Sequence, residues 1–243
     1  MYLINENTDK IQLCNKDLYK GTAVKGVLFD MDGVILDTEK LYTRFWKEAC
    51  AYFGFEMTHD MALGMRSLNS ALGESKLKEY FGDTVDYLLV RNKRIELMTA
   101  FINENGVELK SGVHEVLAFL KENGIKKAIA TSSPLERTQD YLSKVGVIDE
   151  FDKLISARMV ERGKPEPDVY LYAASQLGLK PEECLVIEDS PTGLLAGNRA
   201  GCIPVMVPDQ DQPAEETKQL AYAIVDSLYD LHHLLEWANN IRI

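Results

Sequence analysis

Acidic, hydroxyl and lysine side chains follow four separate apolar runs of this 243-residue chain. In sequence order they are Asp30 and Asp32, then Thr131, Ser132 and Ser133, then Lys164, and then Glu188 and Asp189. Carboxylates that lie together repel one another unless a cation is present, and oxygen ligands without histidine or cysteine suit Mg²⁺. Mg²⁺ commonly binds one or two carboxylates together with a substrate phosphate. The set therefore indicates phosphoryl transfer, which depends mostly on positioning and charge stabilisation.

Each of these motifs has a simpler interpretation when it is taken alone. A D-x-D pair such as Asp30 and Asp32 is most often a turn or a solvated loop, TSSP is an ordinary helix N-cap, and Lys164-Pro165 is a solvated turn. An EF-hand loop needs glycine at its sixth position, whereas Gly33 is the fourth residue counted from Asp30. The placement of all the motifs after successive apolar runs favours the functional interpretation.

The apolar runs are rich in valine, isoleucine and leucine and do not alternate with polar residues, which is typical of strands buried on both faces of a parallel sheet. They are 24–29, 127–130, 154–156, 184–187, 203–207 and, more weakly, 221–225. Helical patterns occur at 112–123, 134–145, 167–177 and 191–200. The alternation predicts a doubly wound, mostly parallel α/β sheet, in which ligands bind outside the carboxyl ends of the strands.

One long segment, residues 38–105, interrupts this alternation. Its apolar residues recur at helical spacing, as at Leu41, Phe45 and Ala49, and it contains no convincing strand. We therefore expect an inserted all-helical domain. The expected division is an N-terminal extension at 1–23, an α/β core at 24–37 and 106–243, and the helical insertion at 38–105.

Composition and charge limit the partners of the chain. Its net charge is −11 and its sequence pI is about 4.9, which argues against general nucleic-acid binding. The four cysteines are widely separated and form no C-x-x-C pair, so a structural zinc site is not expected and a reducing cytosol is the default compartment. The first residues lack a signal-peptide pattern, and no segment reaches a membrane-spanning length. We expect a cytoplasmic protein that binds neither nucleic acid nor membranes.

The segments DMDGV, TSS, GKPEPDVY and EDSPTGLLAGNRAG, in this order, resemble the four motifs of the haloacid dehalogenase-like hydrolase superfamily. The helical insertion after the first motif resembles the cap of its β-phosphoglucomutase and phosphoglycolate-phosphatase subfamily. The resemblance extends from residue 26 to about residue 207. It implies a Rossmann-like core, and a Mg²⁺-dependent phosphatase that hydrolyses a small phosphorylated metabolite through an aspartyl-phosphate.

The resemblance also implies roles for the acidic residues and the lysine of the first and third motifs. Asp30 would be the nucleophile and a Mg²⁺ ligand. Asp32 would be the general acid and then the general base, with its backbone carbonyl on the metal ion. Lys164 would balance the charge between Asp30 and the phosphate.

The second and fourth motifs would complete the site. Thr131 would donate a hydrogen bond to the phosphoryl oxygens, with help from the backbone N–H groups of Ser132. Glu188 and Asp189 would bind the metal ion, directly or through water.

Residues of the insertion are candidates for substrate contacts, because a cap that closes excludes water and adds binding groups. The candidates are Tyr42, Gly64 and Arg66, although a solvated surface arginine is an equally good interpretation of Arg66. β-Phosphoglucomutases that resemble this sequence usually carry a histidine at the position of Tyr42, in DTEKLYTRFW. The absence of this histidine favours hydrolysis, with a sugar-phosphate mutase as the alternative. A cap that opens and closes suits a monomer.

A third hypothesis belongs to another class: an acidic protein that only binds divalent cations, without catalysis. Lys164 argues against it, because a mere cation cage gains nothing from a lysine.

Overall fold

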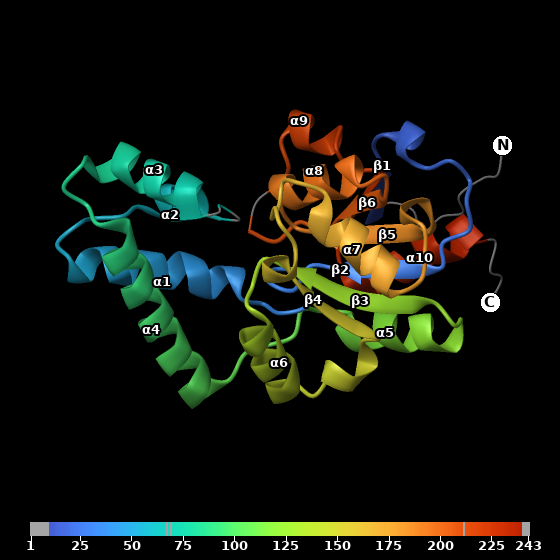
Figure 1. Ribbon diagram of the computed structural model, residues 1–243, viewed down its shortest axis with the longest axis horizontal. Coiled ribbons are helices and arrows are strands. Elements are labelled where there is room, and N and C mark those ends of the chain that lie inside the picture. The colour runs from blue at the N-terminus through green and yellow to red at the C-terminus, as the bar shows by residue number, and fades with distance from the viewer. Residues whose placement is uncertain (1–9, 67, 69, 211, 240–243) are drawn as a thin grey trace. The chain divides into compact units, whose positions relative to one another are not determined.

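The computed structural model describes residues 10–66, 68, 70–210 and 212–239. The chain forms two compact units, one comprising Met1–Leu36 and Leu109–Ile243 and the other Asp37–Glu108. We call the first the α/β unit and the second the helical unit, and Figure 1 labels the elements of both.

The α/β unit contains a seven-stranded sheet with the strand order β1-β7-β6-β5-β2-β3-β4. The strands are β1 (Ile11–Leu13), β2 (Gly26–Phe29), β3 (Lys126–Thr131), β4 (Lys153–Ser156), β5 (Cys184–Glu188), β6 (Ile203–Met206) and β7 (Ala223–Val225). Neighbouring strands run parallel, except that β1 is antiparallel to β7. Phe29 of β2 is in register with Ile129 of β3 and Ile187 of β5. The prediction of a mostly parallel α/β sheet is confirmed, and the carboxyl ends of β2, β3 and β5 lie side by side.

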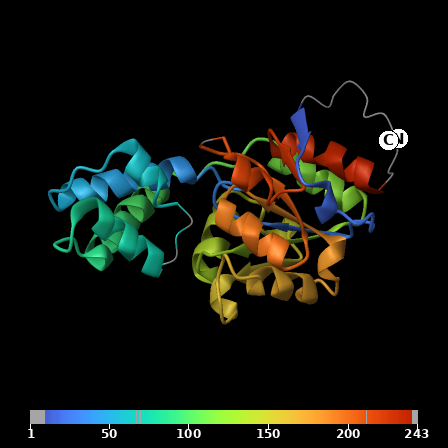
Figure 2. The same ribbon diagram turned by 90° about the horizontal axis from the view of Figure 1, so that it is seen from above.

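Helices cover both faces of this sheet. They are α5 (Val113–Glu122), α6 (Leu135–Lys144), α7 (Asp168–Gln176), α8 (Pro191–Arg199), α9 (Glu215–Lys218) and α10 (Leu228–Asn239). Helix α5 packs against α10 on one face, and α7 packs against α8 on the other (Figure 2). This covering explains why every residue of β2 and of β5 is buried, and why both strands are apolar up to Glu188, the last residue of β5.

Strand β1 lies in the N-terminal segment, where the sequence pattern predicted no element. Three residues are too few to show periodicity, and Ile11–Leu13 becomes a strand because it pairs with the free edge of β7. Residues 1–9 of the expected extension lie outside the described residues.

The helical unit consists of α1 (Glu39–Tyr52), α2 (His59–Leu63), α3 (Ser70–Phe81) and α4 (Tyr87–Asn105). Helix α1 packs along α4, and their buried faces contribute Trp46, Ala49 and Val90 to a core that Leu77 of α3 completes. Helix α4 begins at a side-chain cap, in which Asp86 accepts a hydrogen bond from the Leu89 N–H at 3.1 Å.

Among the described residues of both units, no helix has both the length and the apolarity that a membrane crossing requires.

Candidate active site

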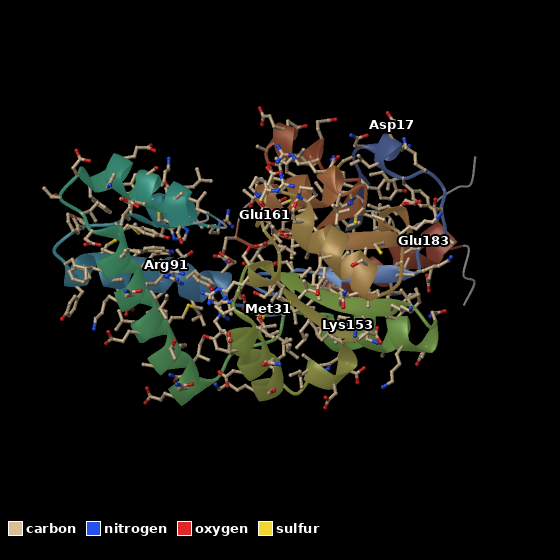
Figure 3. All side chains as sticks on the ribbon, viewed as in Figure 1. Asp17, Met31, Arg91, Lys153, Glu161 and Glu183 are labelled. Carbon is tan, nitrogen blue, oxygen red and sulfur yellow. The ribbon has the colours of Figure 1, made fainter. Side chains whose placement is uncertain are left out.

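The end of strand β2 and the turn after it hold the first two aspartates in place. The Asp30 N–H donates to the Ile187 carbonyl at 2.9 Å, which continues the pairing of β2 with β5 by one residue. Met31, labelled in Figure 3, is fully buried. Gly33 has φ 80°, a left-handed conformation that favours glycine, and its N–H donates to the Leu36 carbonyl at 2.9 Å. A buried strand therefore leads directly into a tight turn, and Asp30 and Asp32 lie at that junction.

Three carboxylates meet at the carboxyl ends of β2 and β5. Oxygen atoms of Asp30, Glu188 and Asp189 all lie within 4.8 Å of one another, and all three residues are buried. In their ionised forms three carboxylates so close together repel one another, and burial raises the cost of each charge. The donors are all oxygen atoms, so the set fits a hard divalent cation such as Mg²⁺.

Lys164 connects two of these carboxylates. Its Nζ donates to Asp30 Oδ1 at 2.5 Å and to Glu188 Oε1 at 2.6 Å. Burial by itself lowers the pKa of Lys164, but the adjacent carboxylates of Asp30 and Glu188 outweigh burial and raise this pKa above its ordinary value. The lysine therefore remains charged at physiological pH.

The pKa of Asp30 is raised from its ordinary value of 3.8 to about 7. Burial is the largest cause, and the nearby carboxylates of Glu188 and Asp32 add to it, whereas Lys164 lowers this pKa. Burial thus disfavours the ionised form of Asp30, and a nearby cation would favour it.

We expect a pH signature of this group in the stability of the metal-free protein. The folded-state pKa of Asp30 lies above its ordinary value, so the folded state binds this proton more tightly and is stabilised as the pH falls from about 8 towards 4. Asp30→Asn lacks the titrating group, and its melting temperature in EDTA should exceed that of the wild type most at pH 8 to 9. This difference should shrink as the pH falls to about 5. A difference that is the same at every pH would contradict the assignment.

The Asp32 carboxylate contacts a different set of groups. Its Oδ2 accepts hydrogen bonds from Ser133 Oγ at 2.7 Å and from Arg137 Nη2 at 2.6 Å. Arg137 also donates to the Ser133 hydroxyl oxygen. No sequence motif contains Arg137. Arg137 lies on helix α6 whereas Ser133 precedes that helix, so no regular sequence spacing indicated this contact.

Thr131 is the last residue of β3 and is almost completely buried. It lies two residues after Ile129, which pairs with Phe29 of β2. Its Oγ1 accepts a hydrogen bond from the Ser133 N–H at 3.1 Å. Ser132 between them is exposed. The loop after β3 therefore begins beside the end of β2, where Asp30 lies.

Glu188 is held by side chains of two helical segments. Its Oε1 accepts a hydrogen bond from the Tyr170 hydroxyl at 2.5 Å, and its Oε2 accepts one from Ser190 Oγ at 2.9 Å. Burial, followed by the charges of Glu188 and Asp30, raises the pKa of Tyr170 well above its ordinary value, so its hydroxyl keeps the proton that it donates. Tyr170 lies within the motif GKPEPDVY, but the sequence pattern indicated no function for it.

The remaining candidates, Tyr42, Gly64 and Arg66, belong to the helical unit. The Arg94 guanidinium lies 4.7 Å from the centre of the Tyr42 ring. Gly64 ends helix α2, where a Cβ atom would lie 2.4 Å from the Tyr80 hydroxyl oxygen. The Arg66 Nε donates to the Leu63 carbonyl at 3.3 Å. A role of these residues in substrate binding stays a prediction.

Comparisons with known proteins agree with the geometry of the α/β unit. A family model described as haloacid dehalogenase-like hydrolase matches residues 24–201. The phosphorylated carbohydrates phosphatase of Thermotoga maritima is 30% identical and the alignment covers 88% of this chain and 91% of that protein. The β-phosphoglucomutase of Bacillus subtilis is 29% identical, over 78% of this chain and 85% of that protein.

Solved structures show the same fold. A haloacid dehalogenase family hydrolase from Deinococcus radiodurans, with bound phosphate and sodium, superposes with a TM-score of 0.73 at 29% identity. The superposition covers 88% of this chain and 96% of that one. Together with the match over residues 24–201, these findings show that the chain belongs to the haloacid dehalogenase-like hydrolases.

Proposed function

We propose that the protein is a Mg²⁺-dependent phosphatase that hydrolyses a small phosphorylated carbohydrate through an aspartyl-phosphate on Asp30. The observation that carries the proposal is the buried group of Asp30, Glu188 and Asp189 with Lys164 in contact with two of them. Such a group suits a metal ion and a phosphate together. The substrate class is supported by the Thermotoga maritima relative, which is named a phosphorylated carbohydrates phosphatase.

In this proposal, Asp30, Glu188, Asp189 and the backbone carbonyl of Asp32 would hold Mg²⁺. When it is bound, the ion supplies positive charge against the phosphoryl oxygens. Lys164 adds a second positive charge and, through its hydrogen bond to Asp30, favours the ionised form that can attack.

Hydrolysis then takes two steps. In the first, a carboxylate oxygen of Asp30 forms a bond to phosphorus, the ester P–O bond breaks, and Asp32 gives its proton to the leaving alcohol. In the second, Asp32 takes a proton from a water molecule as the water attacks phosphorus. The bond from phosphorus to Asp30 breaks, and inorganic phosphate leaves.

The other candidates would bind the substrate. Thr131 and the backbone of Ser132 would donate hydrogen bonds to the phosphoryl oxygens. The helical unit would act as the cap that selects the substrate, with Tyr42, Gly64 and Arg66 as its contacts.

The test is a panel of sugar and hexitol phosphates assayed for release of inorganic phosphate. We expect turnover of at least one of them with Mg²⁺, a fall to the background rate in EDTA, and recovery when Mg²⁺ is added back. Binding of Mg²⁺ without phosphate release from any compound would contradict the proposal and support the hypothesis of a cation-binding protein.

A sugar-phosphate mutase is the second candidate, and the similarity to the Bacillus subtilis β-phosphoglucomutase favours it. We prefer hydrolysis because Tyr42 stands where the β-phosphoglucomutases that resemble this chain usually carry histidine. Incubation with β-glucose 1-phosphate and a sugar bisphosphate separates the two. Formation of glucose 6-phosphate indicates a mutase, whereas release of free phosphate alone indicates a phosphatase.

A further inference from the structure

Glu188 is almost completely buried, at 1% exposure, and side chains contact both oxygens of its carboxylate. Lys164 and Tyr170 donate to Oε1, at 2.6 and 2.5 Å, and Ser190 donates to Oε2 at 2.9 Å. A buried carboxylate with this many donors is held in one orientation.

Tyr170 is the most buried of these three donors. It lies in the first turn of α7 with no exposed surface, and it packs into the core with Leu28 of β2 and Val186 of β5. Lys164 Nζ lies 5.0 Å from the centre of the Tyr170 ring, a distance at which a cation interacts with an aromatic face. A single core side chain thus contacts Glu188 through its hydroxyl and Lys164 through its ring.

Helix α8 closes the space beside the same carboxylate. A Cβ atom built on Gly193 would lie 1.8 Å from Glu188 Oε1 and 2.2 Å from Oε2. Only a residue without a side chain leaves room for the carboxylate there. Glu188 therefore lies between the backbone of α8 and its hydrogen-bond donors, which fix its orientation. Tyr170 and Lys164 donate the two shortest of these hydrogen bonds.

We propose that Tyr170 is a positioning residue of the active site. Its hydroxyl fixes the Glu188 carboxylate in the orientation that the candidate Mg²⁺ site needs, and its ring supports Lys164 against Asp30. This inference rests on the proposed function. Groups that donate hydrogen bonds to metal-binding carboxylates orient them, and their loss typically lowers metal affinity or activity by roughly 10- to 100-fold.

The test is Tyr170→Phe, which keeps the buried ring and removes only the hydroxyl. Titration calorimetry of the purified protein with Mg²⁺ should show an affinity that is roughly 10-fold weaker than that of the wild type. The Mg²⁺ concentration for half-maximal phosphatase activity should rise by the same factor, whereas the KM for the phosphorylated substrate at saturating Mg²⁺ should change less than about twofold. A general loss of packing would instead change the Mg²⁺ affinity and the KM for the substrate together.

The matched control is Tyr222→Phe, which removes the hydroxyl of another buried tyrosine, one whose ring packs against Tyr19. Its Mg²⁺ affinity should equal that of the wild type, and circular dichroism in EDTA should show both variants folded. An unchanged Mg²⁺ affinity in Tyr170→Phe, or an equal loss in both variants, would overturn the inference while leaving the proposed function intact. A wild-type protein that does not bind Mg²⁺ would contradict the proposed function and the inference with it.

Discussion

Asp30→Asn should lower the rate of phosphate release by roughly 10³-fold or more, because the amide cannot form the aspartyl-phosphate and no other group takes over a lost nucleophile. The same change should stabilise the metal-free protein at pH 8. It removes one of three carboxylates that lie within 4.8 Å of one another, and it leaves Lys164 paired with Glu188. Activity and stability are thus expected to move in opposite directions, which separates the loss of a chemical group from the loss of the fold.

The measurements are steady-state kinetics at saturating Mg²⁺ and thermal melting in EDTA. A stabilisation of about 1 kcal/mol would raise the melting temperature of a protein of this size by roughly 2 to 4 °C. Asp149→Asn is the matched control, because Asp149 is exposed in the short helical turn Ile148–Glu150. The control should keep both the activity and the melting temperature of the wild type. Retention of more than about a tenth of the activity by Asp30→Asn would rule out Asp30 as the nucleophile.

The parts of the site that follow strands were predictable from the sequence. A run such as Val27-Leu28-Phe29 is recognisable as a buried strand, and the polar residue that ends it must lie at one edge of the sheet. Because the strands are parallel, Asp30 and Glu188 arrive at the same edge, in positions that the register of β2 with β5 places side by side. Sequence order and strand direction were sufficient for this, without any knowledge of side-chain contacts.

The contacts made by helical residues were not predictable in this way. Tyr170 lies in an apolar helical pattern, where an aromatic residue indicates the core, and its ring is indeed in the core. Only the packing of α7 on the sheet shows that its hydroxyl meets Glu188. Arg137 likewise lies on an ordinary amphipathic helix, and its contact with Asp32 depends on where α6 begins.

Lys164→Met should lower the rate of phosphate release by roughly 10²- to 10³-fold, since it removes a charge that lies against Asp30 and would face the phosphoryl oxygens. It should also destabilise the metal-free protein by about 3–5 kcal/mol at pH 8, because removal of the cation leaves buried carboxylates uncompensated. Methionine is apolar and of similar length, so the loss of packing is small. Kinetics at saturating Mg²⁺ and urea unfolding in EDTA measure the two effects.

The dependence of this destabilisation on pH and Mg²⁺ identifies its cause. If it arises from uncompensated carboxylates, it should be smaller at pH 5.5 than at pH 8, because protonated carboxyl groups need no cation, and the folded-state pKa of Asp30 already lies near 7. Saturating Mg²⁺ should then raise the melting temperature of Lys164→Met more than that of the wild type, without restoring the activity.

Lys127→Met is the control. Lys127 is similarly buried, but it pairs with Val27, which precedes Asp30 by three residues. Lys127 therefore lies roughly 10 Å from the position of Asp30 along the strand direction. The destabilisation of the control should not change with pH or Mg²⁺. The same independence in Lys164→Met would show that Lys164 stabilises the protein by packing and not by its charge.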